Sequence, residues 1–158
     1  MPNQRANAGP DQNYLDFRSS SGRCVPSRHQ AKEHPQVLII APSASSSTLF
    51  TSVTTFSWLA QSARGRGLGR EMRAAALHLA FEGFAAVQAE SEAFTDNVGS
   101  NRISASMGYE VNGLAWASRR GSAGQLQRWR MTRQAWSANR RGDIQLAGVP
   151  DCRAALGC

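Results

Sequence analysis

The feature that most constrains the fold of this chain is a strand-like segment that passes through a glycine- and arginine-rich turn into a helical pattern. Residues 49–59 are rich in Val, Thr, Phe and Trp, as strands are, and residues 64–70 read RGRGLGR. A helical spacing follows at Met72, Ala75, Ala76 and Leu79. A helix that starts beside glycines presents free backbone N–H groups and the positive end of its dipole, so this turn is suited to bind an anion.

The segments on either side of the turn predict more strands. Residues 36–41 are a β-branched run between two prolines, which is typical of a short buried strand. The helix after the turn is expected to stop at Gly83. In residues 85–94, small or apolar residues alternate with polar ones, which predicts a strand. A helical crossover would bring this strand back beside the first one.

A second helix and two late strands complete the expected order. The helix is expected to begin at Asn97 or Gly99 and to stop at Gly108, with Ile103 and Met107 as a buried pair. The late strands are expected at residues 109–115 and 125–131, with a turn of Gly, Ser and Arg between them.

The length of 158 residues is suited to one domain with loose ends. Residues 1–35 are rich in Asn, Gln, Ser, Arg and Pro without a sustained period, so a disordered tail is predicted there. Residues 36–136 form the predicted folded domain, of the α/β (α+β) class. Residues 137–158 are interpreted as a C-terminal tail.

The net charge of +7 comes almost entirely from arginine, since Lys32 is the only lysine. A basic chain favours an anionic partner, such as a nucleic acid, a phosphorylated cofactor or an acidic protein surface. A genome that prefers arginine codons would produce the same total charge. Only the positions of the arginines along the chain can therefore distinguish an anionic partner from codon preference.

The cysteines and histidines indicate no metal site. Cys24, Cys152 and Cys158 lie far apart and show neither a CxxC pair nor zinc-ligand spacing, so free thiols in a reducing compartment are expected. His78 is interpreted as a residue of the helix surface. No window approaches the length of a membrane span, and the first residues lack a signal-peptide core, so a cytoplasmic location without membrane contact is expected.

The spacing of the glycines decides which phosphate ligand the turn fits. The chain lacks the Lys-Ser or Lys-Thr pair of a Walker loop, and Gly65, Gly67 and Gly69 give G-x-G-x-G where a Rossmann fingerprint has G-x-G-x-x-G. The order Arg64-x-x-Gly67-x-Gly69 fits [Q/R]-x-x-G-x-[G/A]. With this motif the chain resembles the GNAT superfamily of acyl-CoA-dependent N-acetyltransferases.

A second segment, DNVGSNRISASMGYE, resembles the other cofactor segment of the same superfamily, N-x-x-S followed by a short helix and Gly-Tyr. Asn97, Ser100 and the pair Gly108-Tyr109 occupy those places. The stretch REMRAAALHLAFEG resembles the RimJ/RimL ribosomal-protein N-terminal acetyltransferase branch. The resemblance covers residues 54–136 and implies a central, mostly antiparallel sheet with flanking helices on both faces.

The resemblance also implies where acetyl-CoA, the cosubstrate, would bind. The backbone of the turn would hold the pyrophosphate, and the strand before it would pair with the pantetheine arm. Two residues of the second segment, Asn97 and Ser100, would hydrogen-bond the cofactor from the opposite side, although Asn97 is equally well explained as a helix cap. The other predicted cofactor residues are Trp58, Leu59 and Ala60 for the arm and Arg64, Gly65, Arg66, Gly67, Leu68, Gly69 and Arg70 for the phosphates.

Acetyl transfer to an amine requires a base and often an acid for the departing thiolate. Family members commonly place a tyrosine seven residues after the asparagine as the acid. This chain has Ser104 there, a poor acid that is better explained as a small residue of helix packing. No Asp or Glu occurs between Glu33 and Glu71, so Glu90 is the candidate base, with Glu92 beside it. Solvated charge at a strand edge would explain these carboxylates as well.

The chain departs from the family upstream of the turn. The 63 residues before Arg64 are fewer than family members usually have, and most are unlike the family's acceptor-binding half. A truncated or replaced acceptor half is therefore expected, with impaired acetylation and an exposed sheet edge that another chain could pair with. The expected acceptor is a primary amine, either a protein N-terminus or a small molecule, and a monomer or a homodimer is expected.

A second function stays open beside acetyl transfer. A non-catalytic module that binds RNA or DNA would use the net positive charge and the arginines of residues 118–130, with Trp129 among them. Arg128 and Arg130 alternate on a strand, however, and one solvated face explains them equally. Such a module predicts binding that weakens steeply with salt and no saturable acetyl-CoA site.

Overall fold

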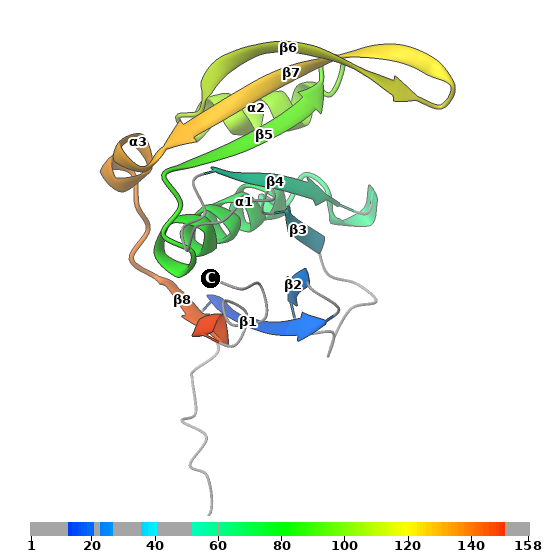
Figure 1. Cartoon of the computed structure of the whole chain (residues 1–158). Coiled ribbons are helices and arrows are strands. Elements are labelled where there is room, and N and C mark those ends of the chain that lie inside the picture. Colours follow the sequence, from blue (N-terminus) through cyan, green and yellow to red (C-terminus); the bar gives the residue numbers. More distant parts are fainter. Residues whose placement is uncertain (1–12, 21–22, 27–35, 41–51, 60, 151–158) are drawn as a thin grey trace, which may run out of the picture.

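The computed structural model describes residues 13–20, 23–26, 36–40, 52–59 and 61–150. Two sheets, three α-helices, the 3-10 turn η1 (Gln61–Ala63) and one π-helical turn make up this part of the chain (Figure 1). The larger sheet has five strands in the order β3-β4-β5-β7-β6. Their bounds are Gln36–Ile40 for β3, Ser52–Trp58 for β4, Gln88–Phe94 for β5, Glu110–Arg119 for β6 and Ser122–Thr132 for β7.

The order of the strands follows from the connections between them. The long connection after β4 contains α1 (Leu68–His78) and the π-helical turn η2 (Leu79–Gly83), and it brings β5 back parallel to β4. Every other neighbouring pair in this sheet is antiparallel. The predicted strand, turn, helix and strand are confirmed, as are the mostly antiparallel sheet and the α/β fold class.

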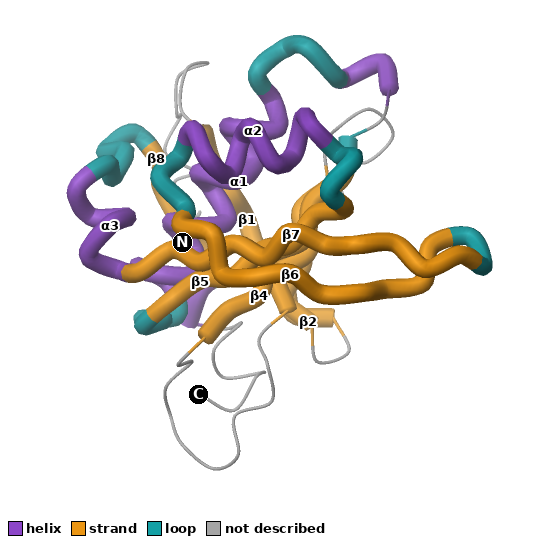
Figure 2. Tube along the Cα trace, turned by 90° about the horizontal axis from the view of Figure 1, so that it is seen from above, coloured by secondary structure: helices purple, strands orange, loops and turns teal. Residues whose placement is uncertain are grey.

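The two longer helices lie on one face of the five-stranded sheet. α2 (Val98–Ser106) packs against α1, because a Cβ added at Gly69 would approach Ile103 Cδ1 to 2.9 Å. The view from above shows both helices on the same side of the strands (Figure 2). In the described part of the chain, helices on both faces are therefore not found, whereas the family resemblance led us to expect them.

The core lies between this sheet and α1. β5 alternates between half-buried and buried residues, with Ala89, Ser91 and Ala93 turned toward the helices. Val53, Leu77 and Met131 are also fully buried there. Burial of these apolar side chains is the main stabilising contribution that fixes α1 on the sheet.

The residues that α2 buries differ from those predicted. Asn97 caps it, since its side-chain Oδ1 accepts a hydrogen bond from Ser100 N at 3.3 Å, and Gly108 ends it with a φ of 85°. Ile103 and Met107 are only half-buried, so the predicted buried pair is wrong. Ser104 is the buried residue of this helix instead, because Arg73 of α1 reaches it.

The ends of the described chain form a second sheet in the order β2-β1-β8. β1 (Asn13–Ser20) pairs antiparallel with β2 (Arg23–Pro26) and parallel with β8 (Ile144–Ala147). The expectation of a disordered tail is therefore wrong for β1 and β2, and the expected C-terminal tail is wrong for β8. The rest of residues 1–35 and residues 151–158 lie outside the described residues.

A short helix, α3 (Arg133–Ala138), links the two sheets. Thr132 caps it by accepting a hydrogen bond from Ala135 N at 3.2 Å. Trp136 stacks on Phe81 at a ring-centroid distance of 5.0 Å. The folded region therefore continues beyond Trp136. The division of the chain into a domain at residues 36–136 and two tails is not otherwise tested and stays a prediction. No helix in the ranges described is long and apolar enough to cross a membrane.

Candidate functional site

The candidate site begins where β4 and β5 part. Their parallel pairing runs only from Ser52 with Gln88 to Thr55 with Ser91, although β4 continues to Trp58 and β5 to Phe94. Figure 1 shows the two strands diverging toward their carboxyl ends. Beyond Thr55, the edge of β4 that faces β5 has no strand partner among the described residues, so its N–H and C=O groups can pair with an extended ligand.

The glycine turn lies directly after this parting. Gly65 and Gly67 adopt φ values of 74° and 78°, which side-chain-bearing residues rarely adopt. The Gly67 carbonyl accepts from Arg70 N at 2.9 Å and Glu71 N at 3.3 Å. Leu68 and Gly69 are the first residues of α1, where backbone N–H groups have no partner within the helix.

The charges at the turn suit an anion. Arg64, Arg66 and Arg70 are exposed, and a Cβ added at Gly65 or Gly67 would meet no atom within 4 Å. The space in front of these two glycines is therefore open to a ligand. Gly69 is different, because its missing side chain makes room for Ile103 of α2 and Leu59.

The structure brings the second predicted segment close to α1. Arg73 is buried at the α1–α2 contact, and its guanidinium donates to Ser104 Oγ at 2.5 Å and to Ser100 Oγ at 3.3 Å. The guanidinium also lies 5.6 Å from the ring centroid of Tyr109. Sequence reasoning missed Arg73, since its position on the helix gave no sign that serines 27 and 31 residues away would accept from it.

The two predicted catalytic residues are not brought together. Ser104 is 0% exposed, accepts from Arg73 and donates to the carbonyl of Ser100, so its hydroxyl is occupied within the protein. Glu90 lies on the opposite face of the sheet, one residue before the end of the β4–β5 pairing. Its carboxylate accepts from Gln88 Nε2 at 3.1 Å and lies 3.6 Å from Arg128 Nη2.

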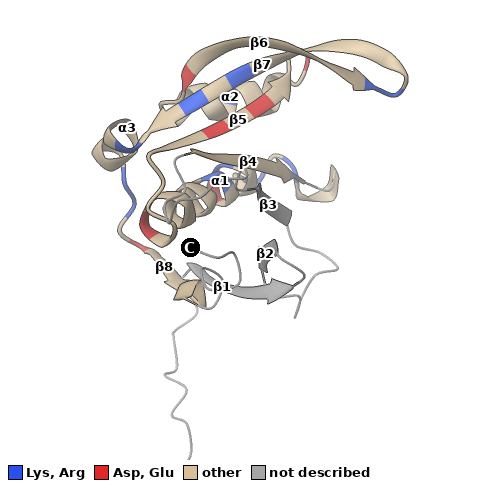
Figure 3. Cartoon of the chain, viewed as in Figure 1, with Lys and Arg blue, Asp and Glu red and all other residues tan. Residues whose placement is uncertain are grey.

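Charged side chains alternate on the face of the sheet that carries Glu90. Figure 3 shows acidic residues on β5 beside basic residues on β7. Besides the pair of Arg128 with Glu90, Arg130 lies 3.2 Å from Glu110. The arginines of β7 therefore face carboxylates, which supports the explanation that they form a solvated face.

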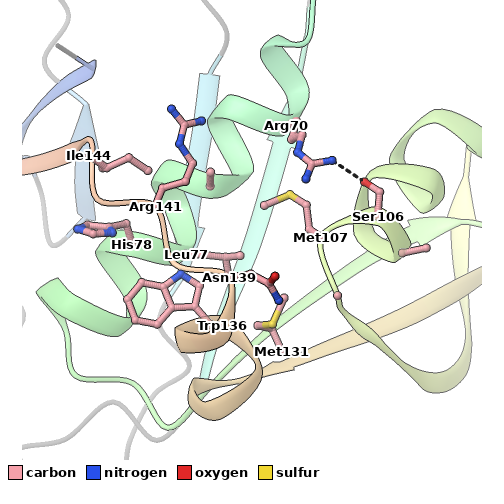
Figure 4. Close-up of a pocket in the computed structure, with 13 residues that line it drawn as sticks. Arg70, Leu77, His78, Ser106, Met107, Met131, Trp136, Asn139, Arg141 and Ile144 are labelled. Carbon is pink, nitrogen blue, oxygen red and sulfur yellow. Dashed lines mark hydrogen bonds between the residues drawn. The ribbon is translucent and has the colours of Figure 1, made fainter.

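A pocket of about 300 Å³ lies between α1, the C-terminal end of α2, α3 and the segment before β8 (Figure 4). Leu77, Met107 and Trp136 contribute apolar surface, and Arg70 and Arg141 supply charge. Arg70 also donates to Ser106 Oγ at 3.3 Å. The sequence did not reveal this pocket, because α1, the end of α2, β7, α3 and residues 139–144 all contribute to its lining.

His78 lies in this pocket and is only 6% exposed, so its interpretation as a helix-surface residue is wrong. The ring of Trp136 covers it, with the two ring centroids 5.8 Å apart. Its Nδ1 has no hydrogen-bond partner among the described residues. Burial, assisted by the charge of Arg140, lowers the pKa of His78 from its usual 6.5.

This lowered pKa predicts a loss of stability in mild acid. The unfolded chain binds a proton at His78 below pH 6.5 while the folded chain resists it, so the free energy of unfolding falls as the pH drops from 6.5. We expect His78→Leu to flatten the slope between pH 6.5 and pH 5 in chemical denaturation. An unchanged slope, relative to the wild type, would refute this role for His78.

Comparisons with known proteins agree with this geometry. Residues 42–110 match a family model described as the acetyltransferase (GNAT) domain. The spermidine/spermine N-acetyltransferase SpeG from Vibrio cholerae is similar in structure, with a TM-score of 0.62 at 15% identity over 74% of this chain and 67% of that one. The structure of yncA from Salmonella typhimurium with its cofactor acetyl-CoA gives a TM-score of 0.55 at 16% identity over 62% and 57%.

A ribosomal-protein-alanine N-acetyltransferase from Brucella melitensis is also similar, with a TM-score of 0.55 at 18% identity over 73% of this chain and 66% of that one. At such identities the likeness shows the acyl-CoA N-acyltransferase fold. The chain spans only 57% of the length of the yncA structure. The predicted resemblance to GNAT acetyltransferases is confirmed, and acetyl-CoA is the cosubstrate of that family.

Proposed function

We propose that this protein is an N-acetyltransferase that transfers the acetyl group of acetyl-CoA to a primary amine. The observation that carries the proposal is the parting of β4 and β5 directly before an open glycine turn at the start of α1. The similar structure with acetyl-CoA as its cofactor supports the choice of ligand.

The residues of the turn fit a pyrophosphate. Two positive-φ glycines leave open space in front of the backbone, and the first N–H groups of α1 begin at Leu68. The exposed guanidinium groups of Arg64, Arg66 and Arg70 add charge on the same segment. We therefore assign the turn to the phosphates of the cofactor.

The backbone of β4 after Thr55 is assigned to the pantetheine arm. Trp58, whose β5-facing edge has no strand partner among the described residues, ends β4, and Leu59 follows it. Ala60, the third residue predicted for the arm, lies outside the described residues. Amide groups of an extended ligand can pair with such a strand edge as another strand would. Asn97 and Ser100, at the start of α2, are assigned to the other side of the arm.

Bound acetyl-CoA would supply a thioester whose C–S bond breaks as the amine nitrogen bonds to the carbonyl carbon. Only a neutral amine has the lone pair for this attack, so the protein must first take a proton from the substrate ammonium. A proton must also reach the departing thiolate to give free coenzyme A thiol. Glu90 is our candidate base, because it lies beside the parting of the strands and Arg128 and Gln88 hold its carboxylate. Ser104, as a buried acceptor for Arg73, is assigned a positioning role in place of the acid role expected from sequence.

A thiol-release assay tests this function. We expect the chain to release coenzyme A thiol from acetyl-CoA when an amine is added, and Glu90→Gln to lower kcat on the order of a hundredfold, as for loss of a general base. Glu92→Gln is the matched control, since Glu92 is on the same face two residues along β5. Equal rates for the two variants would exclude Glu90 as the general base. The absence of thiol release with any amine would contradict the proposed activity.

The acceptor that we propose is a protein N-terminus, as the resemblance to the RimJ/RimL branch implies. The similarity to a ribosomal-protein-alanine N-acetyltransferase supports this choice, although SpeG, a polyamine acetyltransferase by its name, has the same fold. A peptide amine has a pKa near 8 and is partly neutral at physiological pH. Parallel assays with alanyl peptides and with spermidine distinguish the two acceptors. We propose the cytoplasm as the location.

A further inference from the structure

Strand β6 exposes an apolar strip that the proposed acetyl transfer does not use. Five large apolar side chains are widely exposed among the described residues, and three of them lie on β6. Val111 is 64% exposed, Leu114 56% and Trp116 71%. Exposed apolar side chains gathered on one strand indicate a surface that another protein covers.

A β-bulge places the three side chains on one face. Val111 is opposite Trp129 of β7, and after a register shift Leu114 is opposite Gln127. Directly opposed residues of antiparallel strands share a face, so Val111 and Leu114 face the same way despite their odd spacing. Trp116 follows two residues later and joins them.

The other edge of β6 is open. β6 is the last strand of the five-stranded sheet and pairs only with β7 among the described residues. Figure 1 shows the long β6–β7 hairpin projecting from the rest of the sheet. An open edge with apolar side chains is a template for one more strand.

Opposite charges mark the two ends of β6. Glu110 is opposite Arg130 and Arg119 is opposite Ser122, which places both on the face away from the apolar strip. Their side chains are widely exposed, and the pairs they make with Arg130 and Asp96 lie at the surface. An antiparallel copy of the same strand would present the opposite sign at each end.

We propose that β6 pairs antiparallel with β6 of a second copy of this chain, about a twofold axis at Ala115. With the two bulge residues counted as one position, this register places Glu110 opposite Arg119 of the second copy. The same register places Leu114 opposite Trp116 of the second copy. One alignment thus matches both the charges and the apolar strip, and a symmetric dimer is the commonest assembly of soluble proteins.

Sedimentation velocity of the full chain over a range of concentrations tests the dimer. We expect a monomer–dimer equilibrium that Trp116→Lys shifts toward monomer by at least about tenfold in Kd. Val98→Lys is the matched control, because Val98 is 62% exposed on α2 and should leave the equilibrium unchanged. A monomer at every concentration, or an equal effect of the two variants, would overturn the proposal.

Charge reversal and a crosslink test the register. Glu110→Arg should weaken the dimer, and the added Arg119→Glu should restore it, since each exchanged charge again meets its opposite. Ala115→Cys should form an intermolecular disulfide under mild oxidation, because the axis brings the two cysteines face to face. A crosslink no faster than that of Ala117→Cys, or no restoration in the double variant, would overturn the register.

Discussion

Gly67→Ala is expected to lower the affinity for acetyl-CoA on the order of tenfold or more. Gly67 precedes α1 with a φ of 78°, and its carbonyl accepts hydrogen bonds from the backbone N–H groups of Arg70 and Glu71. A side chain there strains the left-handed backbone by roughly 1–2 kcal/mol and projects into the open space assigned to the phosphates. Isothermal titration calorimetry measures the loss directly.

Gly121→Ala is the matched control for backbone strain. Gly121 lies in the β6–β7 turn with a φ of 81°, and a Cβ there would also meet nothing within 4 Å. Both variants should lose a similar amount of stability, while only Gly67→Ala should lose affinity for acetyl-CoA. If both variants bind acetyl-CoA like the wild type, the assignment of the phosphates to the turn is wrong.

Ser104→Ala is expected to lower the free energy of unfolding by about 2 kcal/mol, because the substitution removes the nearer hydroxyl partner of a buried guanidinium. The charge of Arg73 cannot regain water in its place between α1 and α2. Thermal and chemical denaturation measure the loss. The double variant Arg73→Met/Ser104→Ala removes the charge as well, so it should be more stable than Ser104→Ala alone.

Ser106→Ala provides the control for this prediction. Ser106 also lies on α2 and accepts from an arginine of α1, but its bond with Arg70 is exposed. Loss of that bond should change the stability by less than about 0.5 kcal/mol. Equal losses for Ser104→Ala and Ser106→Ala would show that burial of the Arg73 guanidinium does not make the loss of its bond to Ser104 more costly.

The sequence revealed the parts of the fold that depend on local patterns. β4, the turn, α1 and β5 follow one another along the chain, and their periodicity and glycines were sufficient to predict them. The helix that Asn97 caps and Gly108 ends was predicted for the same reason. These segments also carry most of the predicted cofactor residues.

Features that depend on distant segments were missed. β1 pairs with β8, at the other end of the described chain, and no local pattern indicates such a pairing. His78 is buried because Trp136 of α3 covers it, and Ser104 is buried because Arg73 reaches it across 31 residues. An exposed helix position and a buried one look alike in sequence when the covering residue comes from elsewhere.

Calorimetric titration of the full chain with acetyl-CoA is the decisive test of the proposed acetyltransferase. We expect one saturable site per chain and, when an amine is then added, release of free thiol. A site that saturates without thiol release would keep the cofactor assignment and remove the enzymatic one. The absence of any saturable acetyl-CoA binding would contradict both the cofactor site and the proposed function.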